Sequence, residues 1–569
     1  MKLWLKIFIL ATLLFAESTI AANDTDVWSK LNDQASRLCR EGKYLEASLV
    51  AEKALKLAAV KFGPFDPKIA VSLFELAEIY NALGRCRSAE ELYQKTLEAR
   101  KNIFGPKHPA IGVTLAGLAS LYNVWGKYEE AENCYLEALG IYNEVLSLDH
   151  PQIIILKNRI GWFYLTQKRF LEAQTIFETQ LDNLKVGGDA NFHWRIQSLN
   201  GLAEIYKRQG DFDKARKTLI NTLTITERLL GLEAQEVALI LNNLAEVYQL
   251  EHNYQKAEPV YQRALTIYRK IHGPNHPLLG NIQYNLGKLY EAQGIYEQAN
   301  NCFQEALVLR QKAFGLDHTG VADCLWSIAD LQVKLGKYDQ AEINYRKALI
   351  IQEETLGPEG VEVAATLYSL ARLLSVQERF PEAESLFHRA LAIRIKTLGE
   401  ESPGTLAVLE NMASYYQQQQ LYLLAEIYYS KILAVKEQLL SKDAPELAPT
   451  LLELARTYKF QQKKEGSKNY YRQGIGNLKT SQGPACNGLK PFLLELGDLY
   501  FYEGDYENAE SLYRWLVLVI ETNDGLQHAE LISVLERMAI IYSDLGRIEE
   551  SKAIDERAEQ IRSEIEKNG

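Results

Sequence analysis

Apolar residues recur along the chain at the three- and four-residue spacing of a helix that buries one face. Leu73, Leu76, Ala77 and Tyr80 occupy positions i, i+3, i+4 and i+7, and Gly84 follows them. Glycine commonly terminates helices because it accepts the left-handed backbone conformation. The pattern therefore predicts an amphipathic helix that ends near Gly84.

A second helix with the same spacing begins a few residues later. Ala89, Tyr93, Thr96 and Leu97 form its apolar stripe. Because the turn between the two helices is short, they must be antiparallel neighbours. We term the first helix of such a pair helix A and the second helix B.

The helix pair recurs at one constant interval along the chain, without an insertion or deletion. One small residue marks each helix A and another marks each helix B. The helix A positions are Ala35, Ala77, Ala119, Gly161, Ala203, Ala245, Gly287, Ala329, Ala371, Ala413, Ala455, Gly497 and Ala539. The helix B positions are Ala47, Ala89, Ala131, Ala173, Ala215, Ala257, Ala299, Ala341, Ala383, Ala425, Ser467, Ala509 and Ser551. Small side chains permit close helix contacts. The pattern predicts an all-α, right-handed α-solenoid of about thirteen helix-turn-helix repeats over residues 27–565.

These motifs resemble the tetratricopeptide repeat (TPR). The resemblance rests on L-A-x-x-Y in helix A, G-x-Y-x-x-A at the turn, and an aromatic-x-x-A-L segment in helix B. The 42-residue period and the loop at residues 104–109, FGPKHP, are similar to the kinesin-light-chain type of repeat, and Leu241–Ala245 with Tyr248 matches its helix A closely. The resemblance implies a concave groove that binds proteins or peptides, with no catalytic activity and no cofactor. The terminal repeats are expected to act as caps.

One repeat departs from the pattern. Lys464 and Ser467 occupy core positions, and Gly474 and Gly476 fall inside the predicted helix B. Each interior glycine costs about 1 kcal/mol relative to alanine. This helix is expected to be weaker than the others.

The first residues have the layout of a secretory signal peptide. Lys2 and Lys6 precede an apolar run from Ile7 to Ala16, and small residues follow up to Ala22. We predict that residues 1–22 are a signal peptide cleaved near Ala21 or Ala22, so the protein is exported to the periplasm or secreted. The apolar run is too short for a lasting membrane anchor. An uncleaved amphipathic N-terminus is the alternative.

Charge and side-chain chemistry exclude several function classes. The net charge of −11 disfavours a nucleic-acid partner, and the chain carries none of the common hydrolase, nucleotide-binding or zinc-protease motifs. Five of the nine histidines share one loop position, where they are expected to cap or pack the loop rather than bind a metal: His108, His150, His276, His318 and His528. Cys302 and Cys324 lie on consecutive helices, which leaves one disulfide open.

The candidate binding surface is a stripe on helix A, beside the core-facing positions. The position three residues before the small residue, termed here the −3 position, carries three asparagines and then three aromatics in consecutive repeats: Asn158, Asn200, Asn242, Tyr284, Trp326 and Tyr368. Asparagine can both donate to and accept from a peptide backbone. Tyrosine and tryptophan are enriched at interface hot spots. We predict that this row contacts a peptide; the alternative is that the side chains pack on the next helix.

Together these features predict a non-catalytic protein- or peptide-binding scaffold that acts outside the cytoplasm. The first alternative is an intracellular adaptor, similar to kinesin light chain, with an uncleaved N-terminus. A carbohydrate-binding or enzymatic use of the groove is the second. The sequence leaves the partner and the oligomeric state open.

Overall fold

The computed structural model describes residues 25–63, 66–147, 149–184 and 192–568. The predicted signal peptide at residues 1–22 lies outside these ranges. Within them the chain is built of α-helices and two short 3-10 helices, with no β-strand. This confirms the predicted all-α solenoid class. No helix in the described ranges is long and apolar enough to span a membrane.

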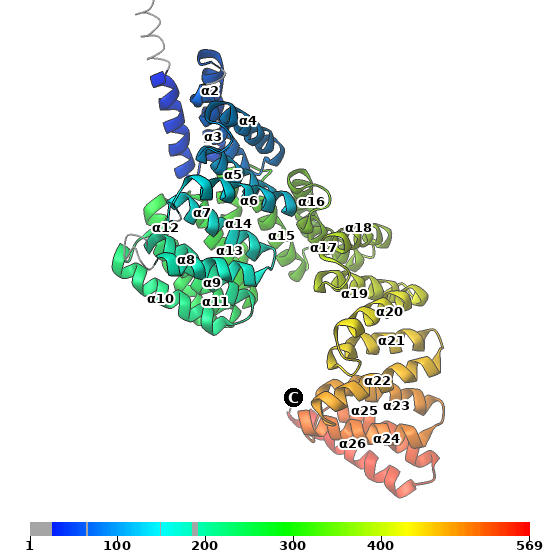
Figure 1. Ribbon diagram of the computed structural model, residues 1–569. Helices are drawn as coiled ribbons and strands as arrows, with labels where there is room; N and C mark the ends of the chain where they lie inside the picture. The colour runs from blue at the N-terminus through cyan, green and yellow to red at the C-terminus, as the bar shows by residue number, and fades with distance from the viewer. Residues whose placement is uncertain (1–24, 64–65, 148, 185–191, 569) are drawn as a thin grey trace, which may run out of the picture. The chain divides into compact units, whose positions relative to one another are not determined.

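The chain divides into two compact units, Met1–Thr366 and Leu367–Gly569. The first, unit 1, opens with a helix at residues 25–40 (Figure 1). The helices that follow it are α2 (Tyr44–Lys61), α3 (Pro67–Ala82), α4 (Cys86–Phe104), α5 (Pro109–Val124), α6 (Tyr128–Val145), α7 (Pro151–Thr166), α8 (Phe170–Leu184), α9 (Phe192–Arg208), α10 (Phe212–Leu230), α11 (Gln235–Leu250), α12 (Tyr254–His272), α13 (Pro277–Ala292), α14 (Tyr296–Phe314), α15 (Thr319–Lys334) and α16 (Tyr338–Leu356).

Helix α17 (Val361–Val376) contains the boundary between the units. The second unit, unit 2, continues the same alternation of helices A and B. Its remaining helices are α18 (Phe380–Leu398), α19 (Pro403–Gln418), α20 (Tyr422–Leu439), η2 (Pro445–Leu447), α21 (Ala448–Phe460), α22 (Lys464–Gln482), η3 (Asn487–Leu489), α23 (Lys490–Tyr502), α24 (Tyr506–Asp524), α25 (Glu530–Asp544) and α26 (Ile548–Asn568).

The small residues lie where helix A meets an aromatic ring of helix B. A Cβ atom added to Gly161 would lie 2.7 Å from the Phe177 ring, and one added to Gly287 would lie 2.5 Å from Phe303. Ala245 is fully buried at the corresponding position of α11. The prediction that these columns are close helix contacts is therefore confirmed.

The loop histidines cap helix A. The Nδ1 atoms of His108 and His150 each accept a hydrogen bond from the backbone N–H two residues later, at 3.2 Å. Asp66 and Ser402 make the same contact with their side-chain oxygens. An acceptor at this position satisfies one of the N–H groups that a helix start leaves unpaired.

The irregular repeat in unit 2 forms its helix B despite the two glycines. A Cβ atom on Gly474 would lie 2.0 Å from Cε1 of Phe492, so the glycine makes room for that buried ring. No comparable contact surrounds Gly476. Ser467 donates a hydrogen bond to the Ala455 carbonyl oxygen at 2.7 Å.

The cysteines are all free thiols, so the disulfide that the sequence left open between Cys302 and Cys324 is not formed. Cys324 is buried and Cys302 is half-buried.

Candidate functional site

Neighbouring helices A are joined by side-chain hydrogen bonds at the predicted binding row. In two of these contacts a −3 residue accepts from the next helix A, at the position directly after that helix's own −3 residue. Asn243 donates to Asn200 at 3.4 Å, and Asn285 donates to Asn242 at 3.0 Å. The row therefore forms a ladder along the stack rather than a set of isolated side chains.

The first two asparagines are buried within this ladder. Asn158 is 3% exposed, and its Oδ1 accepts hydrogen bonds from Gln180 and Ser198. Asn200 is 4% exposed, and its Nδ2 has no hydrogen-bond partner. Both amides lie below the surface, so they support the row from beneath.

The two tyrosines of the row cover arginines, of which Arg310 is buried and Arg394 half-buried. The Arg310 guanidinium lies 4.9 Å from the Tyr284 ring centroid, and Arg394 lies 5.0 Å from Tyr368. Burial raises the pKa of Tyr284 to about 12, although its hydroxyl lies 2.9 Å from that of Ser327. The cation–π contacts fix both rings on their own repeats.

Tyr284 and Arg310 are as far apart in the sequence as Tyr368 and Arg394. Pairs with the same spacing recur in other repeats. Outside the row, Phe74 is covered by Arg100 at this separation, with a ring distance of 4.6 Å. Acidic −3 residues are matched by basic ones at the same spacing. Glu410 pairs with Lys436 at 2.9 Å, and Glu536 with Arg562 at 2.6 Å. The −3 residue is thus complementary to the last turns of its own helix B, a signal that a comparison of these two sequence positions could have found.

Trp326 packs on the core of unit 1 and is half-buried. The Nζ atom of Lys288 lies 5.3 Å from its ring centroid and 5.9 Å from that of Tyr284. Lys288 also pairs with Glu291 at 3.0 Å. Tyr284, Lys288 and Trp326 therefore form an aromatic–cation surface on α13 and α15.

Sequence reasoning missed two accessible residues on α7. Trp162 is 36% exposed, and Arg159 is exposed beside the buried Asn158. Their columns lie beside the −3 column, both on the same side of it, so reading all three columns together would have found them. Trp162 packs edge-on against Phe177 at 6.1 Å, which holds its ring in place.

A half-buried cation joins two successive repeats close to the row. Lys207 pairs with Glu204 at 2.5 Å and with Glu246 at 2.7 Å. Burial by itself would lower the pKa of Lys207, but Glu246 and Glu204 hold it above its usual value. The acidic side chains here are neutralised by the protein itself.

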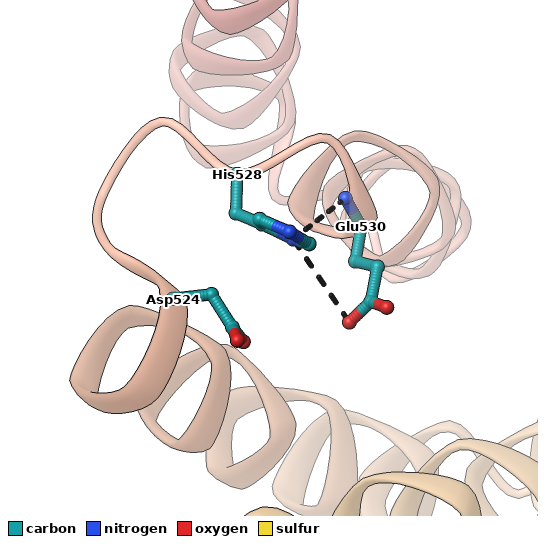
Figure 2. Close-up of side chains that lie close together, drawn as sticks. All are labelled: Asp524, His528 and Glu530. Carbon is teal, nitrogen blue, oxygen red and sulfur yellow. Dashed lines mark hydrogen bonds and ion pairs between the residues drawn. The ribbon is translucent and has the colours of Figure 1, made fainter. Parts of the chain in front are cut away.

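One three-residue group in the described part of the chain could hold a metal ion: Asp524, His528 and Glu530, whose ligand atoms lie within 4.8 Å of one another (Figure 2). Two observations oppose a metal. His528 Nδ1 already accepts a hydrogen bond from the Glu530 N–H at 3.4 Å, which makes it a helix cap. Lys490 pairs with both carboxylates and occupies the place of the cation.

Comparison with known proteins identifies the repeat. A model of the tetratricopeptide repeat matches residues 29–102, 75–144, 114–185, 236–312, 296–354, 321–396, 362–420 and 405–480. A second tetratricopeptide model matches residues 195–234. No curated protein matches the chain significantly.

Solved structures similar to the chain include other repeat proteins. A Podosopora anserina putative kinesin light chain with nearly identical TPR-like repeats is 23% identical, with a TM-score of 0.34 over 36% of this chain and 98% of that one. BtubC (BKLC) from P. vanneervenii is 20% identical, with a TM-score of 0.28 over 48% and 93%. A Rap protein in complex with Competence and Sporulation Factor is 14% identical, with a TM-score of 0.43 over 65% and 98%.

Proposed function

Because the chain belongs to the tetratricopeptide repeat family, we propose that it is a non-catalytic scaffold that binds a protein or peptide ligand outside the cytoplasm. Repeats of this kind bury their cores between neighbours, which leaves one stripe of each helix A to form a continuous track. Such a track suits an extended segment of another chain.

The observation that carries the proposal is the aromatic–cation surface of Tyr284, Lys288 and Trp326. Its rings are held from behind by Arg310 and by the core, so a ligand need not order them. Preorganised aromatic anchors of this kind lower the entropic cost of binding.

Within this proposal the six predicted residues divide by depth. Asn242, Tyr284 and Trp326 contact the ligand on unit 1, and Tyr368 holds the corresponding position on unit 2. Asn158 and Asn200, which are buried, position the row instead of touching the ligand. Trp162 is a further contact residue.

A site-specific cross-linker tests the surface. A photoreactive phenylalanine derivative in place of Trp326 should capture the ligand in the native host. The same group in place of Ile343, which is 53% exposed on helix B of the same pair, serves as the control. Capture from position 343 alone would contradict the proposed surface.

The site of action rests on the signal-like N-terminus of the sequence. N-terminal sequencing of the protein from its host should begin near residue 22 or 23. An intact Met1 and a cytoplasmic location would favour the intracellular adaptor.

A further inference from the structure

Unit 1 contains contacts between segments that lie far apart in the sequence. The ring of Tyr44, at the start of α2, stacks on Phe314 with centroids 5.2 Å apart. In the same region His276 Nε2 lies 3.2 Å from the carbonyl oxygen of Arg40, a separation of 236 residues. The first helix pair of the array therefore touches the loops around α13 and α14.

A second contact lies one repeat further along. His318 hydrogen-bonds the backbone of Ala82, and a Cβ atom on Gly84 would lie 3.6 Å from His318 Cδ2. The turns that follow helix A in the first two repeats, at Arg40 and at Ala82, thus meet the loops that precede α13 and α15. His276 and His318 make the hydrogen bonds of these two connections.

The hydrogen bonds determine the protonation state of these histidines. Nδ1 of His276 accepts from the Leu278 N–H at 3.3 Å, and Nδ1 of His318 accepts from the Gly320 N–H at 2.9 Å. An accepting Nδ1 carries no proton, so Nε2 carries it and donates to the facing carbonyl. Each cap needs a neutral imidazole, because a second proton on Nδ1 would abolish it. The facing carbonyl oxygen still accepts from Nε2 when the ring is charged and by itself raises the pKa, so what opposes protonation is the loss of the cap together with the burial of the charge.

The surroundings of both rings oppose a positive charge. His276 is buried and stacks on His272 at 4.3 Å. Burial and then His272 lower the pKa of His276. His318 stacks on Phe314 at 4.3 Å, and burial followed by Arg310 lowers its pKa to about 4.

The facing turns supply no carboxylate that would stabilise an imidazolium. Glu41 and Lys43 pair with each other at 2.7 Å on the exposed side of the first turn, where the Arg40 side chain is also exposed. The second turn contributes Arg85, which lies over the Tyr80 ring. The charges on these two turns are therefore cations or an already neutralised pair, and the carboxylates of Asp317, Glu353 and Glu354 belong to the adjoining cleft.

We propose that His276 and His318 form an acid-sensitive clasp that holds unit 1 closed, and that protonation of both rings opens it. Closure is fully stabilised above the ordinary histidine pKa of about 6.5. This stabilisation is lost as the pH falls from there, because the open form binds protons more readily. The contact also borders a cleft of about 480 Å³ lined by Leu45, Leu83 and Gly315, which opening would disrupt.

The test replaces both histidines by serine in the full chain. Ser402 shows that serine caps a helix at this position, so His276→Ser with His318→Ser removes the two long-range hydrogen bonds but keeps a cap. The matched control is His108→Ser with His150→Ser, two histidines whose hydrogen bonds are confined to their own caps in the described structure. Fluorophores on non-natural residues at positions 49 and 316, both exposed, report the separation of the two segments.

At pH 7.5 the clasp variant should show low energy transfer, while wild type and control show high transfer. At pH 5 wild type and control should lose transfer reversibly and keep their helical circular dichroism. Equal transfer in the clasp variant and the control at pH 7.5 would overturn the proposal, whatever happens in acid. Unchanged wild-type transfer at pH 5 would overturn its acid sensitivity.

Discussion

At the scale of single residues, some members of the predicted binding row are accessible to a ligand and others are buried supports. The sequence pattern does not separate these two roles. Reading the same position in every repeat finds the column, because a repeat places equivalent residues alike. It does not reveal depth, because burial at this position depends on how large the neighbouring helices' side chains are. Asn158 lies under Gln180 and Ser198, whereas Trp326 reaches the surface.

Trp326 provides the sharpest residue-scale prediction. Trp326→Ala should weaken ligand binding by about 2 kcal/mol or more, as expected for a hot spot. Its effect on unfolding should be well below the roughly 3–5 kcal/mol typical of emptying a buried tryptophan site. Calorimetric titration and thermal melting on one mutant compare the two. A large loss of stability with intact affinity would show that Trp326 is a core residue.

At the scale of elements, helix boundaries and pairing were predictable because each repeat carries its own start and stop signals. In many repeats His or Pro begins helix A and Gly ends it. In five repeats a non-glycine residue takes the same left-handed conformation at the end: Lys168, His252, Glu378, Gln420 and Gln462. The glycines in α22 were misleading from sequence alone, since propensity marks them as weak points. Their different roles depend on Phe492, which faces Gly474 and not Gly476.

These two glycines make a matched pair. Gly476→Ala should stabilise the protein by about 1 kcal/mol through helix propensity, because no atom lies within 4 Å of the new Cβ. Gly474→Ala should instead destabilise it by about 1–3 kcal/mol, the usual cost of overpacking, because Phe492 occupies the space. Urea unfolding of both mutants measures the difference. If both were stabilising, Phe492 would not be held tightly.

The small-residue columns allow a similar comparison. Ala245→Leu should cost about 1–3 kcal/mol, because Ala245 is fully buried between helices. Ala292→Leu, at an exposed position near the end of α13, should change stability by less than about 0.5 kcal/mol. Thermal scans that show no loss for Ala245→Leu would mean that the column is not a packing contact.

At the scale of the whole molecule, the contact between the first repeats and α13–α14 could not be predicted. It depends on small rotations between repeats that accumulate over many helix pairs, and no local pattern encodes their sum. Gly42 has a φ of +73°, which explains why a glycine stands at this turn. That local requirement does not explain why Gly42 lies close to Pro277.

The two reasons for a glycine at this position can be separated. Gly42→Ala and Gly126→Ala introduce the same backbone strain, since both residues have positive φ. Only Gly42→Ala also places a Cβ 2.2 Å from Cδ of Pro277, whereas nothing lies within 4 Å at Gly126. Small-angle X-ray scattering at pH 7.5 should show expansion for Gly42→Ala alone. Identical profiles would mean that the two segments are not in firm contact.

The closure of unit 1 also restricts how the chain can evolve. Arrays of this kind change length by duplicating or losing whole repeats, and most such changes leave every local contact intact. Between Arg40 and His276, however, losing one repeat would bring the loop of His318 opposite Gly42, with Thr319 in place of Pro277. Gaining one repeat would put Ala234, which has no imidazole, in the place of His276. A change in the number of repeats in this segment would therefore alter the contact that closes unit 1, although each repeat taken singly keeps its local contacts.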